Sequence, residues 1–226
     1  MRRIEDITEA IRQYDPEADI DIISKAYVFS AKVHRGQTRL SGEPYMSHPL
    51  EVAFILTQLH MDAISVAVGL LHDTVEDTFA TPEEIKKSFG EEVMLLVESL
   101  TKISKINFAS HEEQQAENFR KMILAMSKDL RVILIKLADR THNVRTLGFM
   151  PQDKQKVIAR ETLDIYAPLA NRLGIGWLKQ NLEDYSFRYL YPKEYKFIEE
   201  SVAKGAEERQ KIIDSTTQIV EEKLSS

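Results

Sequence analysis

The sequence has 226 residues, a hydrophobic fraction of 43% and a charged fraction of 29%, values typical of an ordinary soluble globular protein. This length can bury a full core in one domain with an appended element, and no apolar run reaches the roughly 18 residues that span a bilayer. The net charge of −6 argues against bulk binding to nucleic acid, which needs many Lys and Arg side chains against the phosphates.

The first residues, MRRIEDITEAIRQYD, have neither the apolar core nor the small-residue cleavage site of a signal peptide. The chain contains no Cys, which excludes disulfide bonds. We therefore expect a cytoplasmic protein. A small anionic substrate is still compatible with the acidic composition, because a few local basic residues are enough to bind it.

Apolar residues recur at helical spacing along almost the whole chain. Gly and Pro residues interrupt this spacing at residues 35–45, where we expect a loop or a short hairpin. Further on, Thr81 is followed by a Pro and, three residues later, by a Glu, which predicts a capped short helix ending at Gly90. The predicted helices cover residues 4–14, 20–34, 49–59, 62–75, 82–89, 91–103, 112–126, 130–147, 152–171 with a disturbance at Pro168, and 175–191. The fold class is therefore all-α, a helical bundle of roughly ten or more helices.

The last segment, residues 192–226, carries a helical apolar stripe with nothing after it in the sequence to bury it. The stripe consists of Tyr195, Ile198, Val202, Ala206, Ile212, Ile219 and Leu224. It can pack back on the bundle, form a dimer, or lead into a further domain. We favour the further domain.

Two imidazoles and two carboxylates, those of His48, His72, Asp73 and Asp139, are candidate ligands of one divalent metal. The pair His72-Asp73 closes the apolar segment Ala63–Leu71, and charged groups at the end of a buried helix need compensation from a metal, a partner charge or hydrogen bonds. We expect His72, Asp73 and Asp139 to lie on rigid helices, which suits a fixed coordination geometry. Imidazole and carboxylate together favour manganese, iron or zinc.

The second polar feature is an arc on the predicted helix 130–147. Lys136, Asp139, Asn143 and Thr146 fall on one face of an otherwise apolar helix, and we expect this face to form the floor of a site. Lys136 and the neighbouring Arg140 can hold substrate phosphates or pair with the acidic groups, with Lys102 a weaker candidate. His34, His60, His111 and His142 are expected to be packing or surface residues.

Two further carboxylates follow the predicted ligands by one helical turn, Glu76 after His72 and Asp77 after Asp73. A divalent metal lowers the pKa of water bound to it and stabilises charge on a phosphoryl oxygen. We expect one of these two carboxylates to handle the proton of that water.

Five strings of this sequence resemble the N-terminal hydrolase domain of the long Rel/Spo enzymes, which are HD-type phosphohydrolases that degrade alarmone nucleotides. They are HRGQTRLSGEPYMSHPLEVA (34–53), GLLHDTVEDT (69–78), LTK (100–102), KLADRTHNVRTL (136–147) and IARETLDIYAPLANRLGI (158–175). The resemblance implies an HD-domain helical bundle that removes the 3′-pyrophosphate of guanosine tetra- or pentaphosphate, giving GDP or GTP and pyrophosphate.

The resemblance also implies roles for individual residues. It implies one Mn²⁺ per chain, held by His48, His72, Asp73 and Asp139, with Glu76-Asp77 as the catalytic acidic pair. It implies that Arg39 stacks on the guanine base with Ser41 nearby, and that Asn143 and Thr146 line the nucleotide pocket. Leu40 departs from the family pattern, where a basic residue often follows the Arg, so a phosphate contact at this position is in doubt.

The same resemblance divides the chain into a hydrolase domain, residues 1–191, and a helical connector, residues 192–226, that leads toward a synthetase domain. None of the strings resembles the basic nucleotide-binding strings of that synthetase, so we expect a truncated hydrolase half rather than a small stand-alone hydrolase. The resemblance implies a guanine nucleotide as the partner, and we expect this chain to bind neither nucleic acid nor a membrane. Two other functions are considered: another HD-type nucleotide phosphohydrolase, and a non-catalytic domain that senses the alarmone.

Overall fold

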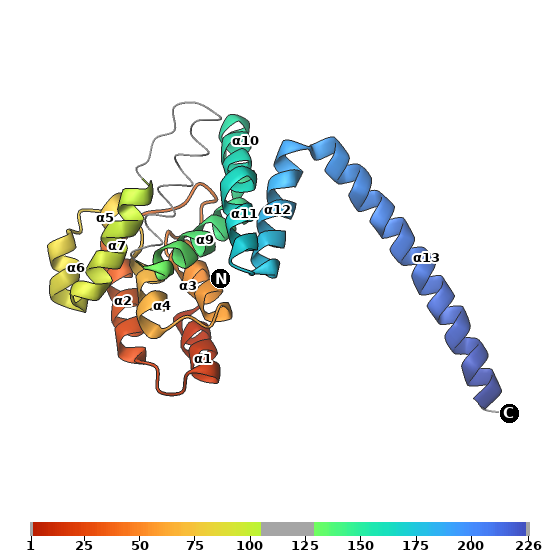
Figure 1. Cartoon of the computed structure of the whole chain (residues 1–226), viewed down its shortest axis with the longest axis horizontal. Coiled ribbons are helices and arrows are strands. Elements are labelled where there is room, and N and C mark those ends of the chain that lie inside the picture. Colours follow the sequence, from red (N-terminus) through yellow and green to blue (C-terminus); the bar gives the residue numbers. More distant parts are fainter. Residues whose placement is uncertain (1, 105–128, 225–226) are drawn as a thin grey trace.

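The computed structural model describes residues 2–104 and 129–224. Over these residues the protein is all-α, and the only β pairing is a single antiparallel bridge between Thr38 and Pro44. The expected all-α bundle of ten or more helices is confirmed by the helices labelled in Figure 1. The helix predicted over residues 112–126 and His111 lie outside the described residues.

The first four helices pack together and contribute a large part of the hydrophobic core (Figure 1). They are α1 (Ile4–Tyr14), α2 (Ile20–Val33), α3 (Ser47–Gln58) and α4 (Ala63–Leu71). Helix α4 is apolar on all sides and packs between α2 and α3. Gly69 permits the close approach of α4 to α3, because an added Cβ would lie 2.6 Å from Leu56 Cδ1 and 3.5 Å from Ala53 Cα.

The loop between α2 and α3 forms the expected hairpin-like turn. The backbone amide of Arg39 donates to the carbonyl of Glu43 at 2.9 Å, and the amide of Tyr45 donates to the carbonyl of Gln37 at 3.1 Å. Gly42 closes the turn at a φ of 83°, in the left-handed region that glycine enters without steric cost. Arg39 is therefore part of the turn that precedes α3.

The prediction of one continuous helix over residues 62–75 is wrong. Helix α4 ends at Leu71, and a separate short helix, α5 (Thr74–Asp77), begins after the pair His72-Asp73. The Thr74 hydroxyl donates to the carbonyl of Leu71 at 2.6 Å and competes with the helical ladder. His72 and Asp73 therefore lie at a junction between two helices, not within a rigid helix.

Helices α6 (Pro82–Phe89) and α7 (Glu91–Ser104) follow and pack against each other, and α7 also contacts α4 (Figure 1). The cap predicted from sequence is confirmed: Thr81 Oγ1 accepts from the amide of Glu84 at 3.2 Å, and the Glu84 carboxylate accepts from the amide of Thr81 at 3.0 Å. Gly90, at a φ of 91°, ends the helix as expected.

Helix α9 (Leu130–Arg145) crosses the core and contacts α3, α4, α7 and α12. It is followed by a 3-10 turn, η1 (Leu147–Phe149), then by α10 (Gln152–Glu161), the π-helical turn η2 (Thr162–Tyr166), α11 (Ala167–Arg172) and α12 (Gly176–Leu190). The disturbance expected at Pro168 is this π-helical turn. Pro168 has no amide proton, so the normal helical hydrogen bond to the carbonyl four residues earlier cannot form.

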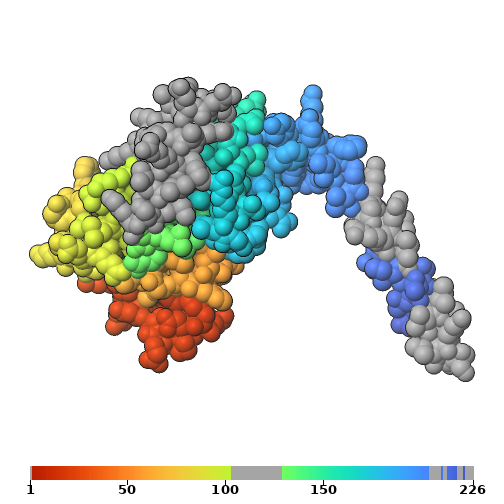
Figure 2. Space-filling view, viewed as in Figure 1, coloured from red at the N-terminus to blue at the C-terminus, as the bar shows by residue number. Residues whose placement is uncertain are grey.

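The last helix, α13 (Pro192–Leu224), starts against α12 and then extends away from the body (Figures 1 and 2). Of the predicted apolar stripe, Ile198 and Val202 are 50% and 59% exposed. These two residues do not pack back on the bundle. No helix in the described part of the chain is both long and apolar enough to cross a membrane.

Candidate functional site

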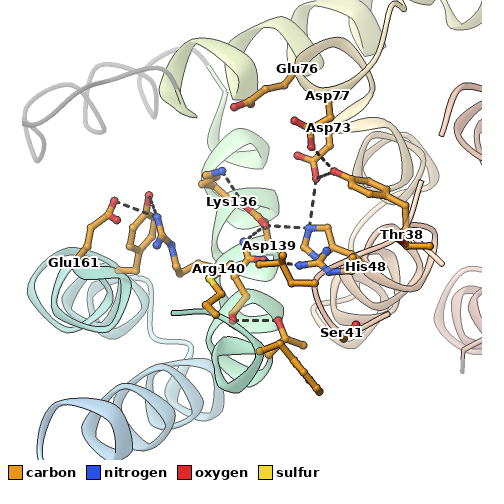
Figure 3. Close-up of a pocket in the computed structure, with 18 residues that line it drawn as sticks. Thr38, Ser41, His48, Asp73, Glu76, Asp77, Lys136, Asp139, Arg140 and Glu161 are labelled. Carbon is orange, nitrogen blue, oxygen red and sulfur yellow. Dashed lines mark hydrogen bonds and ion pairs between the residues drawn. The ribbon is translucent and has the colours of Figure 1, made fainter. Parts of the chain in front are cut away.

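The predicted metal ligands come from three parts of the chain, and Figure 3 shows three of them, His48, Asp73 and Asp139, close together. His48 lies in the first turn of α3, His72 and Asp73 lie at the α4–α5 junction, and Asp139 lies on α9. His48, His72 and Asp139 are buried, and each offers a ligand atom within 4.8 Å of the others. Asp73 contacts both imidazoles, with Oδ1 3.1 Å from His72 Nε2 and Oδ2 3.5 Å from His48 Nε2.

The chemistry of these donors fits a divalent cation. The Nε2 atoms of His48 and His72 are 3.2 Å apart, and Asp139 Oδ1 lies 3.2 Å from His48 Nε2. His72 Nδ1 lies 2.8 Å from the carbonyl of Gly69, to which it donates, so the Nε2 of a neutral His72 carries a lone pair. Such a hydrogen bond from the outer nitrogen is the usual way in which a metal-binding imidazole is oriented.

The electrostatics of the cluster favour positive charge where the four side chains meet. Burial lowers the pKa of His72, but the adjacent Asp73 carboxylate outweighs this effect and raises the pKa to about 9. Burial raises the pKa of Asp139, but Lys136 and the imidazole of His48 hold it well below its usual range. Burial lowers the pKa of His48. A divalent cation supplies the positive charge that these buried carboxylates attract.

Asp139 has two further partners on its own helix, as the predicted polar arc requires. Lys136 Nζ lies 2.7 Å from Asp139 Oδ2, and Asn143 Nδ2 donates to Asp139 Oδ1 at 2.6 Å. Asn143 Oδ1 in turn accepts from Arg39 Nη2 at 3.4 Å. Asn143 therefore connects the hairpin-like turn to the cluster of predicted metal ligands.

Tyr45 is a site residue that the sequence analysis missed. Its hydroxyl lies 3.1 Å from Asp73 Oδ2 and also makes a short hydrogen bond to Asp77 Oδ2. Its ring stacks on His34 at a centroid distance of 4.1 Å. Burial, with the charge of Asp73, raises the pKa of Tyr45 above its ordinary value, so the phenol stays protonated and donates. The sequence did contain one indication of this role, because Tyr45 lies only three residues before the predicted ligand His48.

A pocket of about 760 Å³ opens beside the cluster of predicted metal ligands, and this volume suits a small-molecule ligand. Its lining includes three of the predicted metal ligands, both predicted catalytic carboxylates and all six predicted substrate-binding residues. These are His48, Asp73 and Asp139; Glu76 and Asp77; and Arg39, Ser41, Lys136, Arg140, Asn143 and Thr146. His72 is buried and is not among the lining residues.

Apolar side chains also line the pocket. Leu40 and Phe149 line it and are 72% and 60% exposed. Arg39 lies beside Leu40 on the same turn. Apolar side chains beside a guanidinium suit the planar face of a base. Leu40 thus contributes apolar surface here.

Arg140, which also lines the pocket, is held by two residues that were also missed, Glu161 and Tyr166. Arg140 Nη2 lies 3.1 Å from Glu161 Oε1 and 3.2 Å from the Tyr166 hydroxyl, and the guanidinium stacks over the Tyr166 ring at 4.3 Å. The buried Nε of Arg140 has no hydrogen-bond partner among the described residues. The π-helical turn brings Tyr166 to this position, and nothing in the local sequence indicated that it would. Lys102 is exposed, pairs with Glu98 and does not line the pocket.

Among the remaining histidines, His34 and His60 stack on tyrosine rings, consistent with the expected packing roles. His142 is also buried, but its ring contacts a predicted ligand: His142 Nδ1 lies 2.7 Å from His48 Nδ1. Burial, together with the neighbouring His48 and Arg39, lowers the pKa of His142 to about 3. His142 is therefore neutral at physiological pH.

The bundle and its buried His-Asp cluster define the class of the protein. A family model described as HD domain matches residues 26–176, and the chain belongs to the HD domain family. The curated relatives are long Rel/Spo enzymes. The chain is 58% identical over 218 residues to a GTP pyrophosphokinase of Myxococcus xanthus, covering 95% of this chain and 29% of the relative.

It is also 47% identical over 224 residues to the bifunctional (p)ppGpp synthase/hydrolase SpoT of Escherichia coli K12, covering 99% of this chain and 32% of that protein. A solved structure of a metazoan ortholog of SpoT that hydrolyses ppGpp is similar, with a TM-score of 0.53 and 25% identity, over 77% of this chain and 96% of that one. The chain thus spans less than a third of the length of these curated relatives.

Proposed function

We propose that this chain is a metal-dependent hydrolase that removes the 3′-pyrophosphate of guanosine tetra- or pentaphosphate. The observation that carries the proposal is the His-Asp cluster at the wall of a nucleotide-sized pocket that also holds two further carboxylates, Glu76 and Asp77. The names of the relatives include both the synthesis and the hydrolysis of this nucleotide. The cluster favours hydrolysis, because metal and carboxylates are the parts that the attack of water on a phosphate requires.

We assign the metal as Mn²⁺, one per chain, with His48, His72, Asp73 and Asp139 as its ligands. The mixed imidazole and carboxylate donors support a borderline metal of this kind. When bound, the cation supplies a Lewis acid that stabilises charge on the phosphoryl oxygens and activates water.

The acidic pair handles the protons of the reaction. The oxygen of water forms a bond to the phosphorus attached to the ribose 3′-oxygen, and the bond between that phosphorus and the 3′-oxygen breaks. The water loses a proton and the 3′-oxygen gains one, giving pyrophosphate and GDP or GTP. Glu76 and Asp77 line the pocket beside the cluster, and Tyr45 fixes the carboxylate of Asp77 by donating its phenolic proton.

The remaining pocket residues bind the nucleotide. Arg39 stacks on the guanine, with Ser41, Asn143 and Thr146 lining the same region. Lys136 and Arg140 face the phosphates. Arg140 is suited to this role because Glu161 and Tyr166 already fix the orientation of its guanidinium.

We also infer a division of the chain into two parts. Residues 1–191 form the hydrolase domain, and residues 192–226 form a connector toward a synthetase domain in a longer cytoplasmic protein. The exposed apolar residues on α13 and the short span of the relatives that this chain matches support this division.

The test is incubation of the purified chain, loaded with Mn²⁺, with guanosine tetraphosphate, followed by chromatography of the products. We expect GDP and pyrophosphate in equal amounts, and no turnover by a His72→Ala variant whose helical circular dichroism is unchanged. Release of orthophosphate, or turnover of other nucleotides only, would instead indicate a different HD-type phosphohydrolase. Binding of the nucleotide without turnover would indicate a sensing domain.

A further inference from the structure

His142 lies on α9, nearly one helical turn after the predicted ligand Asp139, and packs against the rear of His48. The ring centroids of His48 and His142 are 4.8 Å apart, with an interplanar angle of 44°. The two Nδ1 atoms are 2.7 Å apart, a hydrogen-bond distance, and the residues are only 2% and 7% exposed. Water therefore has little access to either nitrogen of this contact.

This contact has one consistent assignment if His48 binds a metal. Nε2 of His48 faces Asp139 Oδ1 and Nε2 of His72, so Nε2 is the nitrogen that would bind. Nε2 must then carry a lone pair, and the proton of the neutral ring must sit on Nδ1. Two Nδ1 atoms at 2.7 Å share a single proton, so Nδ1 of His142 is the acceptor.

The opposite assignment blocks the site. If His142 donated from Nδ1, the proton of His48 would move to Nε2 and point into the cluster of ligand atoms. His72 has no such ambiguity, because the Gly69 carbonyl opposite its Nδ1 can only accept. The two imidazole ligands are thus oriented differently, one by a backbone carbonyl and one by a side chain that must be in the correct tautomer.

We propose that His142 is a positioning residue that accepts the Nδ1 proton of His48 and so keeps His48 Nε2 free for the metal. The inference rests on the metal site of the proposed function but not on the identity of the substrate. Outer partners of metal-binding imidazoles typically contribute about 10- to 100-fold to metal affinity. His142 is expected to do the same without touching the metal or the nucleotide.

Two variants separate the acceptor from the bulk of the side chain. In His142→Asn, Oδ1 is attached to Cγ as Nδ1 is in histidine, so it can accept from His48. In His142→Leu, the volume is largely kept and the acceptor is lost. Titration calorimetry with Mn²⁺ should show about 10- to 100-fold weaker binding for His142→Leu, and binding within about threefold of the native protein for His142→Asn. His60→Asn, which removes a histidine stacked on Tyr14 away from the site, serves as the control and should bind Mn²⁺ normally.

A second measurement needs no substitution. Ring ¹⁵N chemical shifts of the native protein loaded with diamagnetic Zn²⁺ should show His48 protonated at Nδ1 and His142 protonated at Nε2. The proposal is overturned if His142 is protonated at Nδ1, if His142→Leu binds Mn²⁺ like the native protein, or if the Asn and Leu variants weaken binding equally. Normal metal binding without hydrolysis of guanosine tetraphosphate would refute the proposed function and leave this inference standing.

Discussion

Replacing Lys136 by Met should destabilise the metal-free protein and strengthen its binding of metal. Lys136 Nζ lies 2.7 Å from Asp139 Oδ2, and the two side chains are 15% and 5% exposed. Removing one partner of a buried ion pair costs about 3 to 5 kcal/mol, because the other charge stays buried. Since Lys136 keeps some contact with solvent and Asp139 keeps its hydrogen bond from Asn143, we expect about 3 kcal/mol.

A divalent cation at the cluster changes this balance. It compensates the Asp139 carboxylate directly, so the loss of stability in saturating Mn²⁺ should be at most about half as large. By linkage, the difference of at least about 1.5 kcal/mol appears as tighter binding of Mn²⁺ by about tenfold or more. The same variant should bind guanosine tetraphosphate more weakly, because a cation beside the phosphates has been removed.

The assay is chemical unfolding followed by circular dichroism, with and without Mn²⁺, together with calorimetric titration of the metal. Lys102→Met is the matched control. Lys102 makes an exposed pair with Glu98 at 3.0 Å, and such surface pairs contribute about 0.5 kcal/mol or less. Equal destabilisation by the two substitutions, or weaker binding of Mn²⁺ by Lys136→Met, would refute the electrostatic reasoning.

Three further predictions concern pH, proton transfer and the base. The pKa of His72 is raised from 6.5 to about 9, so its contribution to the stability of the metal-free protein is complete below about pH 6.5 and is lost as the pH rises through 9. Because the metal displaces that proton, calorimetry should show the Mn²⁺ affinity rising about tenfold per pH unit between about pH 7 and 9. An affinity that does not change with pH would contradict this prediction. Glu76→Gln and Asp77→Asn should keep normal Mn²⁺ binding and lose about 100-fold or more in turnover, whereas loss of the metal in both would make them ligands. Arg39→Ala should weaken nucleotide binding by about 1 to 2 kcal/mol with Mn²⁺ binding intact, and Arg39→Lys should recover little of it; native affinity in Arg39→Ala would place the base elsewhere.

The local features of this fold were predictable because their causes are local. The capped start of α6, the turn at residues 35–45 and the polar arc on α9 depend on residues within one or two turns of each other. The break between α4 and α5 was missed although its cause is also local. Helical periodicity continues through His72 and Asp73, where the hydroxyl of Thr74 bonds to the Leu71 carbonyl and competes with the helical ladder.

Candidate site residues could be chosen from the sequence when their side chains are of types that bind metal or phosphate. Residues that only hold another side chain in place could not be chosen in this way. Tyr45 and His142 became visible only when the fold placed them against Asp77 and His48, across 32 and 94 residues of sequence. Tyr166 depends on the irregular turn η2, whose register no period of apolar residues reveals. Contacts of this kind are set by tertiary packing, which a single sequence does not specify position by position.

Gly69 limits how this protein can be made more thermostable by substitutions in its helices. Exchanging a helical glycine for alanine normally gains about 1 kcal/mol, so α4 would be an early choice for such a change. Here the new methyl group would meet Leu56, which is fully buried and has to move within a packed core. The carbonyl of the same residue orients His72. A substitution chosen only for helix propensity would therefore shift a predicted metal ligand, so a gain in helix stability would be expected to weaken the proposed metal binding.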